Sequence, residues 1–363
     1  MRFKHLFFAT ALLSAMPLFY ACDDNENDIP EEIQVESKNG LYVTNAGNFY
    51  GNINGSLSFI DFDKGEVTNK LFMSVNGRSL GGTPQDAVVY GSKMYIAVYE
   101  SNVIEVVDKT TAESIKQIVP TEAQGVGPRD IVAAGGNVFV SMYDGCVSRI
   151  DTTSLAIDAT IAVGPNPEEM AVANNYLYVT NSDGMNYGAG YANGKTVSKI
   201  NIGSFAEEKK IEVGLNPTKI CATADGNIFL IAMGNYADVP ATVQKIDAGD
   251  NVTDVAYATL MAVKDNTLYL INAPYGAAAN EYIKYDTQAG TSTSDFIDQP
   301  VDSPCGIAVH PTTGKIYISS YNLVGGYASY DTDGYLNEYS ADGKFAQRYN
   351  VGIGPCGLNF LLK

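Results

Sequence analysis

Charged and polar side chains that could do chemistry recur directly after prolines at four places in the chain. These side chains are Gln85 and Asp86, Arg129 and Asp130, Glu168 and Glu169, and Thr218 and Lys219. If the four segments converge in the fold, their carboxylates could act as general acid and base or hold calcium, as in a metal-assisted hydrolase. We favour the simpler interpretation that these acids are solvated or ion-paired around a pore. For Arg129, pairing with these carboxylates and contact with a ligand are equal alternatives.

Histidine offers little further chemistry. The chain contains only His5 and His310, and His310 is followed by Pro-Thr-Thr-Gly, which is typical of a turn. A single histidine in a mature chain nearly excludes multi-histidine metal centres and leaves a cysteine nucleophile without a partner base. We therefore expect a binding protein with no catalytic residues, no metal and no cofactor.

The cysteines match no zinc-binding pattern. Beyond Cys22, the chain contains Cys146, Cys221, Cys305 and Cys356. Cys305 and Cys356 both lie in Pro-Cys-Gly, so a disulfide between them is one alternative. We favour the other alternative, in which both are small buried residues with free thiols.

Composition restricts the class of partner. Hydrophobic residues make up 45% of the 363 residues and charged residues 18%, which predicts a globular chain with a sizeable core. There are 23 Lys and Arg against 41 Asp and Glu, for a net charge of −18. Nucleic-acid binding requires basic side chains that displace counterions from phosphates, so we expect no nucleic-acid partner.

An internal repeat predicts the elements that position these side chains. Leu41–Asn45 reads Leu-Tyr-Val-Thr-Asn, and so does Leu177–Asn181. Weaker copies bring the number to seven, at a mean spacing of about 46 residues. Most copies follow a proline with an apolar run and precede an alternating stretch that ends in Asp or Asn, and a fourth apolar stretch follows. Each unit therefore predicts four short strands, A to D, as in a propeller blade.

The two ends of the repeat array complement each other. The copy at Leu41 has no proline strand before it, whereas Gly354–Leu362 is a proline strand with no unit after it. We therefore predict an all-β fold, a seven-bladed β-propeller closed by the C-terminal strand, which completes the first blade. The sixth blade is the weakest, with Ala258 in place of proline, and a pair of β-sandwiches is the alternative. We expect strand A of each blade to be innermost and buried.

The Tyr-Val-Thr-Asn repeat, with Gly-x-x-Pro upstream and Val-Ser-x-Ile-Asp downstream, resembles the YVTN-type β-propeller family over residues 40–363. In such a propeller the D–A and B–C loops share one face around a central channel. Every B–C loop of this chain contributes tyrosine, and several add asparagine and glycine, a composition typical of adaptable recognition surfaces; tyrosines that merely pack between blades are the alternative. The predicted ligand-binding residues are Gln85, Asp86, Tyr99, Arg129, Asp130, Tyr143, Glu168, Asn181, Tyr187, Tyr191, Asn235, Tyr236, Asn272, Tyr275 and Tyr321.

The N-terminal residues predict export. Residues 1–21 have a basic start and an apolar run typical of a signal peptide. Phe19–Cys22 resembles a bacterial lipobox, which implies lipidation of Cys22, and residues 22–38 form an acidic tether before a propeller over residues 39–363. The acidic start resembles the surface-export signal of Bacteroidetes lipoproteins and implies an outer-membrane protein that faces the cell surface. Secretion with cleavage nearby is the alternative.

The lipidated acidic N-terminus, the tyrosine-rich loops and Gly81–Val88 together resemble Bacteroidetes surface lipoproteins of the BtuG type. This resemblance implies capture of vitamin B12 (cobalamin) and related corrinoids, and their transfer to a TonB-dependent outer-membrane transporter. Two alternatives stay open: an adhesin on the same scaffold that binds glycan or protein, and the metal-assisted hydrolase.

Overall fold

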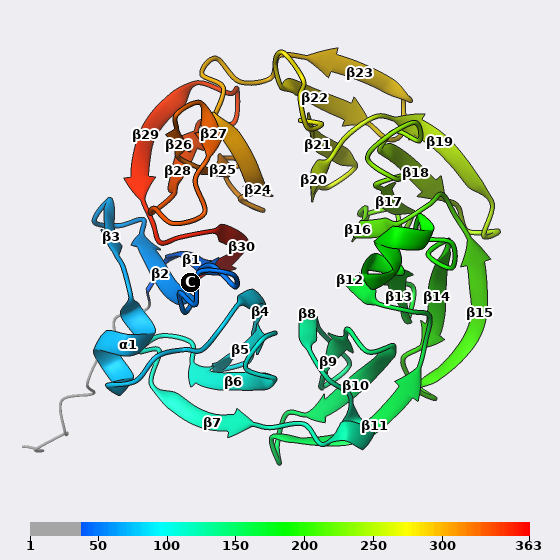
Figure 1. Ribbon diagram of the computed structural model, residues 1–363, viewed down its shortest axis with the longest axis horizontal. Coiled ribbons are helices and arrows are strands. Elements are labelled where there is room, and N and C mark those ends of the chain that lie inside the picture. The colour runs from blue at the N-terminus through cyan, green and yellow to red at the C-terminus, as the bar shows by residue number, and fades with distance from the viewer. Residues whose placement is uncertain (1–37) are drawn as a thin grey trace, which may run out of the picture. The chain divides into compact units, whose positions relative to one another are not determined.

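Seven four-stranded antiparallel sheets surround a central axis in residues 38–363, the part of the chain that the computed structural model describes (Figure 1). The predicted seven-bladed β-propeller is confirmed. The predicted signal peptide, Cys22 and nearly all of the predicted tether lie outside the described residues. Within residues 38–363, no helix is long and apolar enough to cross a lipid bilayer.

Six blades are continuous in the chain, and in each of them the strands run from the axis outwards in sequence order. Blade 2 comprises β4 (Pro84–Tyr90), β5 (Lys93–Val98), β6 (Val103–Asp108) and β7 (Ser114–Ile118). Blade 3 comprises β8 (Pro128–Ala134), β9 (Asn137–Met142), β10 (Cys146–Asp151) and β11 (Ala156–Ala162). Blade 4 comprises β12 (Pro167–Ala173), β13 (Tyr176–Asn181), β14 (Thr196–Asn201) and β15 (Ala206–Glu212). Blade 5 comprises β16 (Pro217–Ala222), β17 (Ile228–Ala232), β18 (Thr242–Ile246) and β19 (Val252–Ala256). Blade 6 comprises β20 (Leu260–Lys264), β21 (Thr267–Asn272), β22 (Glu281–Asp286) and β23 (Thr291–Ser294). Blade 7 comprises β24 (Ser303–Val309), β25 (Ile316–Tyr321), β28 (Tyr335–Tyr339) and β29 (Phe345–Asn350).

Blade 1 is built from both ends of the described chain. Its strand order is β3 (Glu66–Thr68), β2 (Ser56–Asp61), β1 (Gly40–Asn45) and β30 (Pro355–Leu361). β30 is innermost and pairs antiparallel with β1, with Val43 opposite Leu358. The predicted closure is confirmed, and it gives β1 a partner on the edge that would otherwise be open to pairing with another chain.

Burial differs from the prediction for the innermost strands. The second strand of each blade is almost entirely buried, and every residue of β1 and of β17 is buried. The innermost strands are mostly half-buried, as β4 and β20 illustrate. The prediction of buried A strands was wrong because the inner edge of such a strand borders the central channel, whereas the second strand has a strand on each edge and a blade on each face.

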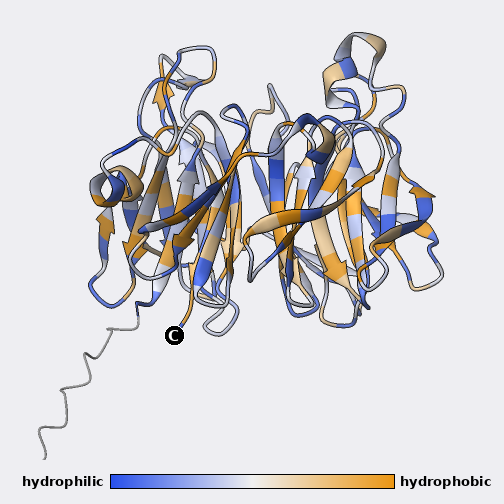
Figure 2. Ribbon diagram, turned by 90° about the horizontal axis from the view of Figure 1, so that it is seen from below, coloured by the Kyte–Doolittle hydropathy of each residue, from blue (hydrophilic) through white to orange (hydrophobic). Residues whose placement is uncertain are grey.

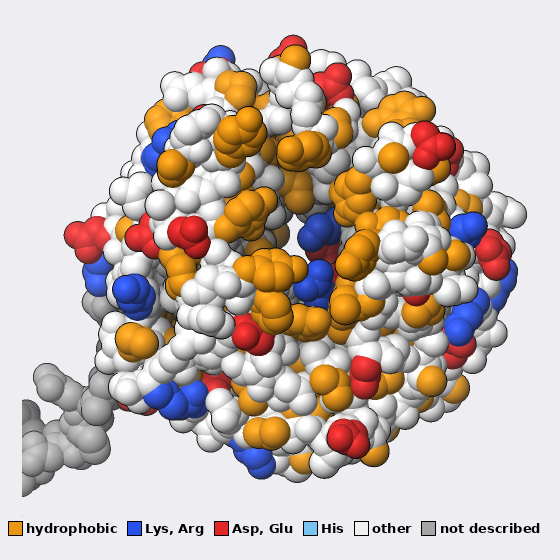
Figure 3. Space-filling view, viewed as in Figure 1, with side chains coloured by type: hydrophobic (Ala, Val, Ile, Leu, Met, Phe, Trp, Pro, Cys, Tyr) orange, Lys and Arg blue, Asp and Glu red, His pale blue; other side chains and the backbone are white. Residues whose placement is uncertain are grey.

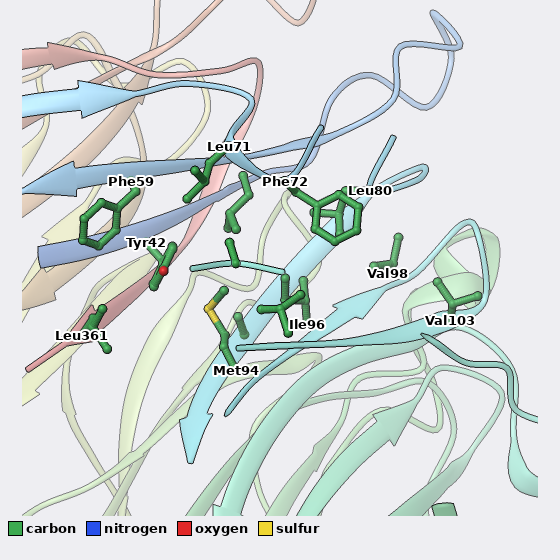
Figure 4. Close-up of a cluster of buried hydrophobic side chains, with 14 residues drawn as sticks. Tyr42, Phe59, Leu71, Phe72, Leu80, Met94, Ile96, Val98, Val103 and Leu361 are labelled. Atoms are coloured by element: carbon green, nitrogen blue, oxygen red, sulfur yellow. The ribbon is translucent and has the colours of Figure 1, made fainter. Parts of the chain in front are cut away.

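Apolar clusters join neighbouring blades. Between blades 1 and 2, Tyr42, Phe59, Met94 and Leu361 are buried in one cluster (Figure 4). The short helix α1 (Leu71–Asn76) closes this cluster from the outside with its two buried residues, Leu71 and Phe72. Burial of each large apolar side chain stabilises the fold by about 1.5–3 kcal/mol, so the interfaces between blades hold the ring together.

The B–C and D–A loops lie on one face, as predicted. The N–H group of Tyr143 in one B–C loop donates to the carbonyl of Gly127 in the preceding D–A loop, and Met233 donates in the same way to Asn216. Two insertions rise from this face: the 3₁₀ helix η2 (Gly184–Ala189) in blade 4, and the hairpin of β26 (Leu323–Val324) and β27 (Tyr327–Ala328) in blade 7 (Figures 1 and 2). The other 3₁₀ helix, η1 (Glu122–Gln124), precedes β8.

His310 lies in the hairpin between β24 and β25, as the turn sequence predicted. Its Nδ1 accepts hydrogen bonds from the N–H groups of Thr312 and Thr313, both at 3.2 Å. The ring also packs against Phe360, with the ring centroids 5.1 Å apart. The histidine side chain therefore closes a turn and anchors it to the innermost strand of blade 1.

Candidate functional site

A cavity of about 670 Å³ opens at the centre of the B–C loop face. Figure 3 shows hydrophobic side chains around this opening and basic side chains inside it. Of the residues predicted to bind ligand, nine line the cavity: Gln85, Asp86, Arg129, Asp130, Tyr143, Glu168, Tyr191, Tyr236 and Tyr321.

The floor of the cavity consists of residues at the start of each innermost strand, directly after the proline of the repeat or, in blade 6, after Ala258. On blades 2 to 5 most of these residues are charged, as in the pairs Arg129–Asp130 and Glu168–Glu169. On blades 6, 7 and 1 the floor residues carry no charge. They are Thr259, Leu260, Cys305, Cys356 and Gly357. One half of the floor is therefore ionic and the other half is uncharged.

Both basic side chains of the floor are held in ion pairs between adjacent blades. Arg129 Nε donates to Glu168 Oε2 at 2.6 Å. The Lys219 ammonium donates to Glu169 Oε1, also at 2.6 Å. Burial alone would lower the pKa of each basic group, but the partner carboxylate outweighs burial and raises it. Both cations are thus engaged by the protein itself.

Asp86 and Asp130 form a second electrostatic unit in the floor. Burial raises the pKa of Asp86 to about 6, although hydrogen bonds from Ala87 and Asn359 oppose the shift. Burial, followed by the charges of Asp86 and Glu169, raises the pKa of Asp130 well above its usual value. Asp130 Oδ2 also accepts the N–H of Met170 at 2.8 Å, which ties blade 3 to blade 4. Like charges this close favour a proton held between the two carboxylates.

Tyrosines form a collar above the floor. The rings of Tyr191 and Tyr236 meet edge to face at 6.2 Å, and both residues have left-handed backbone conformations, with φ of 58° and 57°. A bulky residue seldom adopts this conformation, and such local strain clusters at functional sites. On blade 3, the Arg129 guanidinium lies 4.9 Å from the centroid of Tyr143 and 5.6 Å from that of Tyr99. Tyr99 therefore supports the collar from behind without lining the cavity.

Asn181 does not reach the cavity, so its predicted ligand contact was wrong. Its side chain is 0% exposed. Its Oδ1 accepts the N–H of Gly164, and its Nδ2 donates to the hydroxyls of Thr196 and Ser198. The asparagine of the Tyr-Val-Thr-Asn motif thus fastens the second strand to its neighbours, and Asn45 bonds to Ser58 in a similar way.

Four other predicted residues lie on the same face but outside the cavity. Asn235 donates to Asp238 and accepts from two backbone N–H groups of its own loop, and Asn272 donates to Glu281. Tyr187 and Tyr275 are 73% and 99% exposed. Which residues of these segments reach the cavity is not revealed by their order in the sequence.

Two cysteines were missed as cavity residues. Cys305 and Cys356 line the uncharged half of the floor and are free, so the alternative of a disulfide between them is not formed. Each thiol instead faces a backbone carbonyl of the next blade, Cys305 that of Pro355 at 3.0 Å and Cys356 that of Gln85 at 3.2 Å. The signal was present in the sequence, because both directly follow the proline of strand A, as Arg129 does.

The cavity presents several kinds of surface to a ligand. No group of three or more His, Cys, Asp or Glu side chains within residues 38–363 is placed to hold a metal ion. The cavity combines aromatic rings, neutral donors and acceptors such as Gln85, Asn216 and Thr218, two ion pairs, and the buried carboxyl groups of Asp86 and Asp130. Such a site suits an uncharged ligand with both apolar and hydrogen-bonding surface.

Comparisons with known proteins bear on the fold. The family model described as a domain of unknown function (DUF5074) matches residues 39–353. No curated protein matches the chain significantly.

Solved structures share the propeller at low sequence identity. A candidate 6-phosphogluconolactonase from Bacteroides fragilis has a TM-score of 0.61 at 15% identity, over 90% of this chain and 99% of that one. The hydrazine synthase of Kuenenia stuttgartiensis has a TM-score of 0.56 at 16% identity, over 76% and 88%. A chain of a mitotic checkpoint complex has a TM-score of 0.55 at 11% identity, over 93% and 89%. The functions named differ widely, so these likenesses establish the fold alone.

Proposed function

For this chain, which belongs to the family described as a domain of unknown function (DUF5074), we propose that the central cavity captures a large amphipathic ligand with little net charge, specifically vitamin B12 (cobalamin) or a related corrinoid. A corrinoid combines a broad macrocycle with peripheral amide groups. Tyrosine rings can pack against the macrocycle, and neutral side chains such as Gln85 and Thr218 can bond to amides.

The observation that carries the proposal is the division of the floor beneath the tyrosine collar. Arg129 and Lys219 are each paired to a glutamate at 2.6 Å, which leaves no unpaired cation among the described basic residues that line the cavity. The uncharged half, with Leu260 and the two cysteines, offers apolar contact. A neutral ligand with amides on its edge can use both halves without breaking an ion pair.

The same observation disfavours a phosphorylated sugar as ligand. A sugar phosphate monoester has a net negative charge, unlike cobalamin, whose phosphodiester is balanced within the molecule. Such a monoester would have to draw Arg129 or Lys219 away from a glutamate, and the remaining buried carboxylate would then be uncompensated. Within residues 38–363, the acids of the floor are also not part of any group of three or more side chains placed to hold a metal ion. The proposal is therefore binding without turnover, and we expect no hydrolysis of 6-phosphogluconolactone by the purified protein.

The proposed location rests on the N-terminal sequence, and the proposed partner rests on the proposed ligand. A signal peptide over residues 1–21, lipidation of Cys22 and the acidic stretch after it support a lipoprotein of the outer membrane that faces the cell surface. A surface protein that captures a corrinoid needs a route into the cell, and a TonB-dependent outer-membrane transporter is the proposed recipient. An adhesin that binds glycan or protein is the competing function.

Titration of the purified protein with cyanocobalamin tests the proposed function. We expect one-to-one binding by calorimetry, with a change in the visible spectrum of the corrin. Cobinamide, which lacks the nucleotide arm, should also bind if the macrocycle and its amides are what the cavity recognises. Neither heat nor a spectral change at micromolar protein would overturn corrinoid capture.

A further inference from the structure

A second cavity of about 650 Å³ lies on the same face, away from the axis. It forms where the loop between β1 and β2 meets the loop of blade 7 that carries the β26–β27 hairpin. Its walls include Phe49, Tyr50, Val324 and Tyr330, and its polar groups include Asn48 and Asp331. Of the predicted ligand-binding residues, none lines this cavity, and the proposed corrinoid site does not use it.

Exposed aromatic rings form the walls. Tyr50 is 93% exposed, Phe49 51% and Tyr330 56%. Phe49 and Tyr50 meet at 85° with centroids 5.3 Å apart, and Tyr330 packs on Tyr321 at 4.9 Å. Rings left this open contribute little to folding, and a cluster of them around a cavity is typical of a binding surface.

The polar groups form a fixed pair across the two blades. Asn48 Nδ2 donates to Asp331 Oδ1 at 2.7 Å, while Asn48 Oδ1 accepts the N–H of Gly51 at 3.0 Å. The other carboxylate oxygen of Asp331 makes no hydrogen bond or ion pair with residues 38–363. One charged acceptor is thus held in a fixed position at the edge of the aromatic walls.

The loop of blade 1 is preorganised. Ala46 and Gly47 donate N–H bonds to the carbonyls of Gly354 and Ile353, and Asn48 and Ile53 exchange a pair of backbone bonds at 2.9 Å. This wall is therefore already ordered before a ligand binds, so binding costs little conformational entropy there.

We infer that this cavity binds a neutral pyranose residue of a glycan. A pyranose has a face of C–H groups that packs on the electron-rich face of an aromatic ring and a rim of hydroxyls that donate to a carboxylate. Tyr50 and Phe49 offer the rings, and Asp331 offers the acceptor. Among the described residues, no Lys, Arg or His lines the cavity, and Asp331 would repel an acidic sugar, so the ligand is uncharged.

Saturation-transfer NMR with methyl glycosides of glucose, galactose, mannose and N-acetylglucosamine at millimolar concentration tests this inference. We expect transfer to the ring C–H protons of at least one of them and none to glucuronic acid. Tyr50→Ala and Asp331→Asn should each reduce the transfer at least fivefold. The side-chain amide introduced by Asp331→Asn can still accept a hydrogen bond from Asn48, and Tyr50 is exposed, so neither variant should change the melting temperature. Tyr275→Ala, which removes an equally exposed ring outside the cavity, should leave the transfer unchanged.

Three outcomes would overturn the inference: no transfer to any neutral glycoside, transfer that survives both substitutions, or stronger transfer to adenosine than to the sugars. Cyanocobalamin titration of the Tyr50→Ala variant separates this site from the central one. Unchanged cobalamin binding with lost sugar binding supports two sites. Loss of both would assign the second cavity to the corrinoid site and overturn the sugar proposal. Absence of cobalamin binding to the wild-type protein would refute only the proposed function.

Discussion

Tyr191 and Tyr236 come from adjacent blades, and each has a left-handed backbone, so that their rings meet edge to face at 6.2 Å at the mouth of the central cavity. Neither position carries glycine, although glycine would adopt this conformation without strain. Both positions therefore carry an aromatic ring in spite of the backbone strain that it causes there.

Replacement of both tyrosines by asparagine should weaken cobalamin binding by about 1–4 kcal/mol. Asparagine tolerates the left-handed conformation, so the backbone can stay in place while both rings are lost. Calorimetry gives the binding change and thermal unfolding gives the stability change, which should be close to zero. A matching drop in stability would mean that the two rings pack as part of the fold and do not form a binding collar.

Arg129→Met should destabilise the protein by about 2–4 kcal/mol, because the substitution leaves the Glu168 carboxylate without its cation. The double variant Arg129→Met with Glu168→Gln should recover part of that loss. Urea unfolding of the two single variants and the double variant measures the coupling. If the loss of stability in the double variant equals the sum of the losses in the two single variants, the ion pair contributes nothing to joining blades 3 and 4.

Asp130→Asn should make the protein more stable above pH 6 and leave stability nearly unchanged near pH 4. The pKa of Asp86 is raised to about 6 and that of Asp130 is raised well above its usual value. The folded protein therefore binds protons more tightly than the unfolded chain, and stability falls as pH rises from about 4 through 6. The asparagine variant escapes this fall.

Urea unfolding at pH 4.5 and pH 8 measures the effect, which should reach about 1–3 kcal/mol at the higher pH. Asp333→Asn, at an exposed position, serves as the control and should show no such dependence. A gain for Asp130→Asn that is equal at both pH values would contradict the shared-proton interpretation.

Deletion of residues 354–363 should abolish cooperative unfolding. It removes β30, the innermost strand of blade 1, and exposes the edge of β1 that pairs with it. Removal of only Leu362 and Lys363, which follow β30, should be tolerated. Circular dichroism during heating compares the two, and an intact transition in the longer deletion would show that the ring does not depend on this closure.

The four cysteines of the propeller should be unreactive in the native protein and fully reactive after unfolding without reductant. Burial raises the pKa of Cys146 and of Cys305 to about 12 and also raises those of Cys221 and Cys356, so almost no thiolate forms at neutral pH. Titration with a thiol reagent in urea should count four thiols in residues 38–363. A count of two would indicate a disulfide that the folded structure does not contain.

The number of blades and their closure could be predicted because both are encoded locally. Each unit repeats the same short strands and turn residues, as Leu41–Asn45 and Leu177–Asn181 do. A blade leaves an apolar face on each side, so seven blades must stack in a ring, and the proline strand at Pro355 can only complete blade 1. The shared face of the loops follows from the order of strands in each blade.

The composition of the site depended on tertiary structure. Which carboxylate pairs with Arg129 is decided by the distance across the blade interface, where Glu168 lies at 2.6 Å. Asn181 is the last residue of the second strand of blade 4 and Tyr275 closely follows the second strand of blade 6, yet one is fully buried and the other fully exposed. The sequence by itself determined the ring and the rim on which recognition residues gather. Only the packing of blades against one another decided which of them face the axis, because side-chain direction there follows from contacts between segments far apart in the chain.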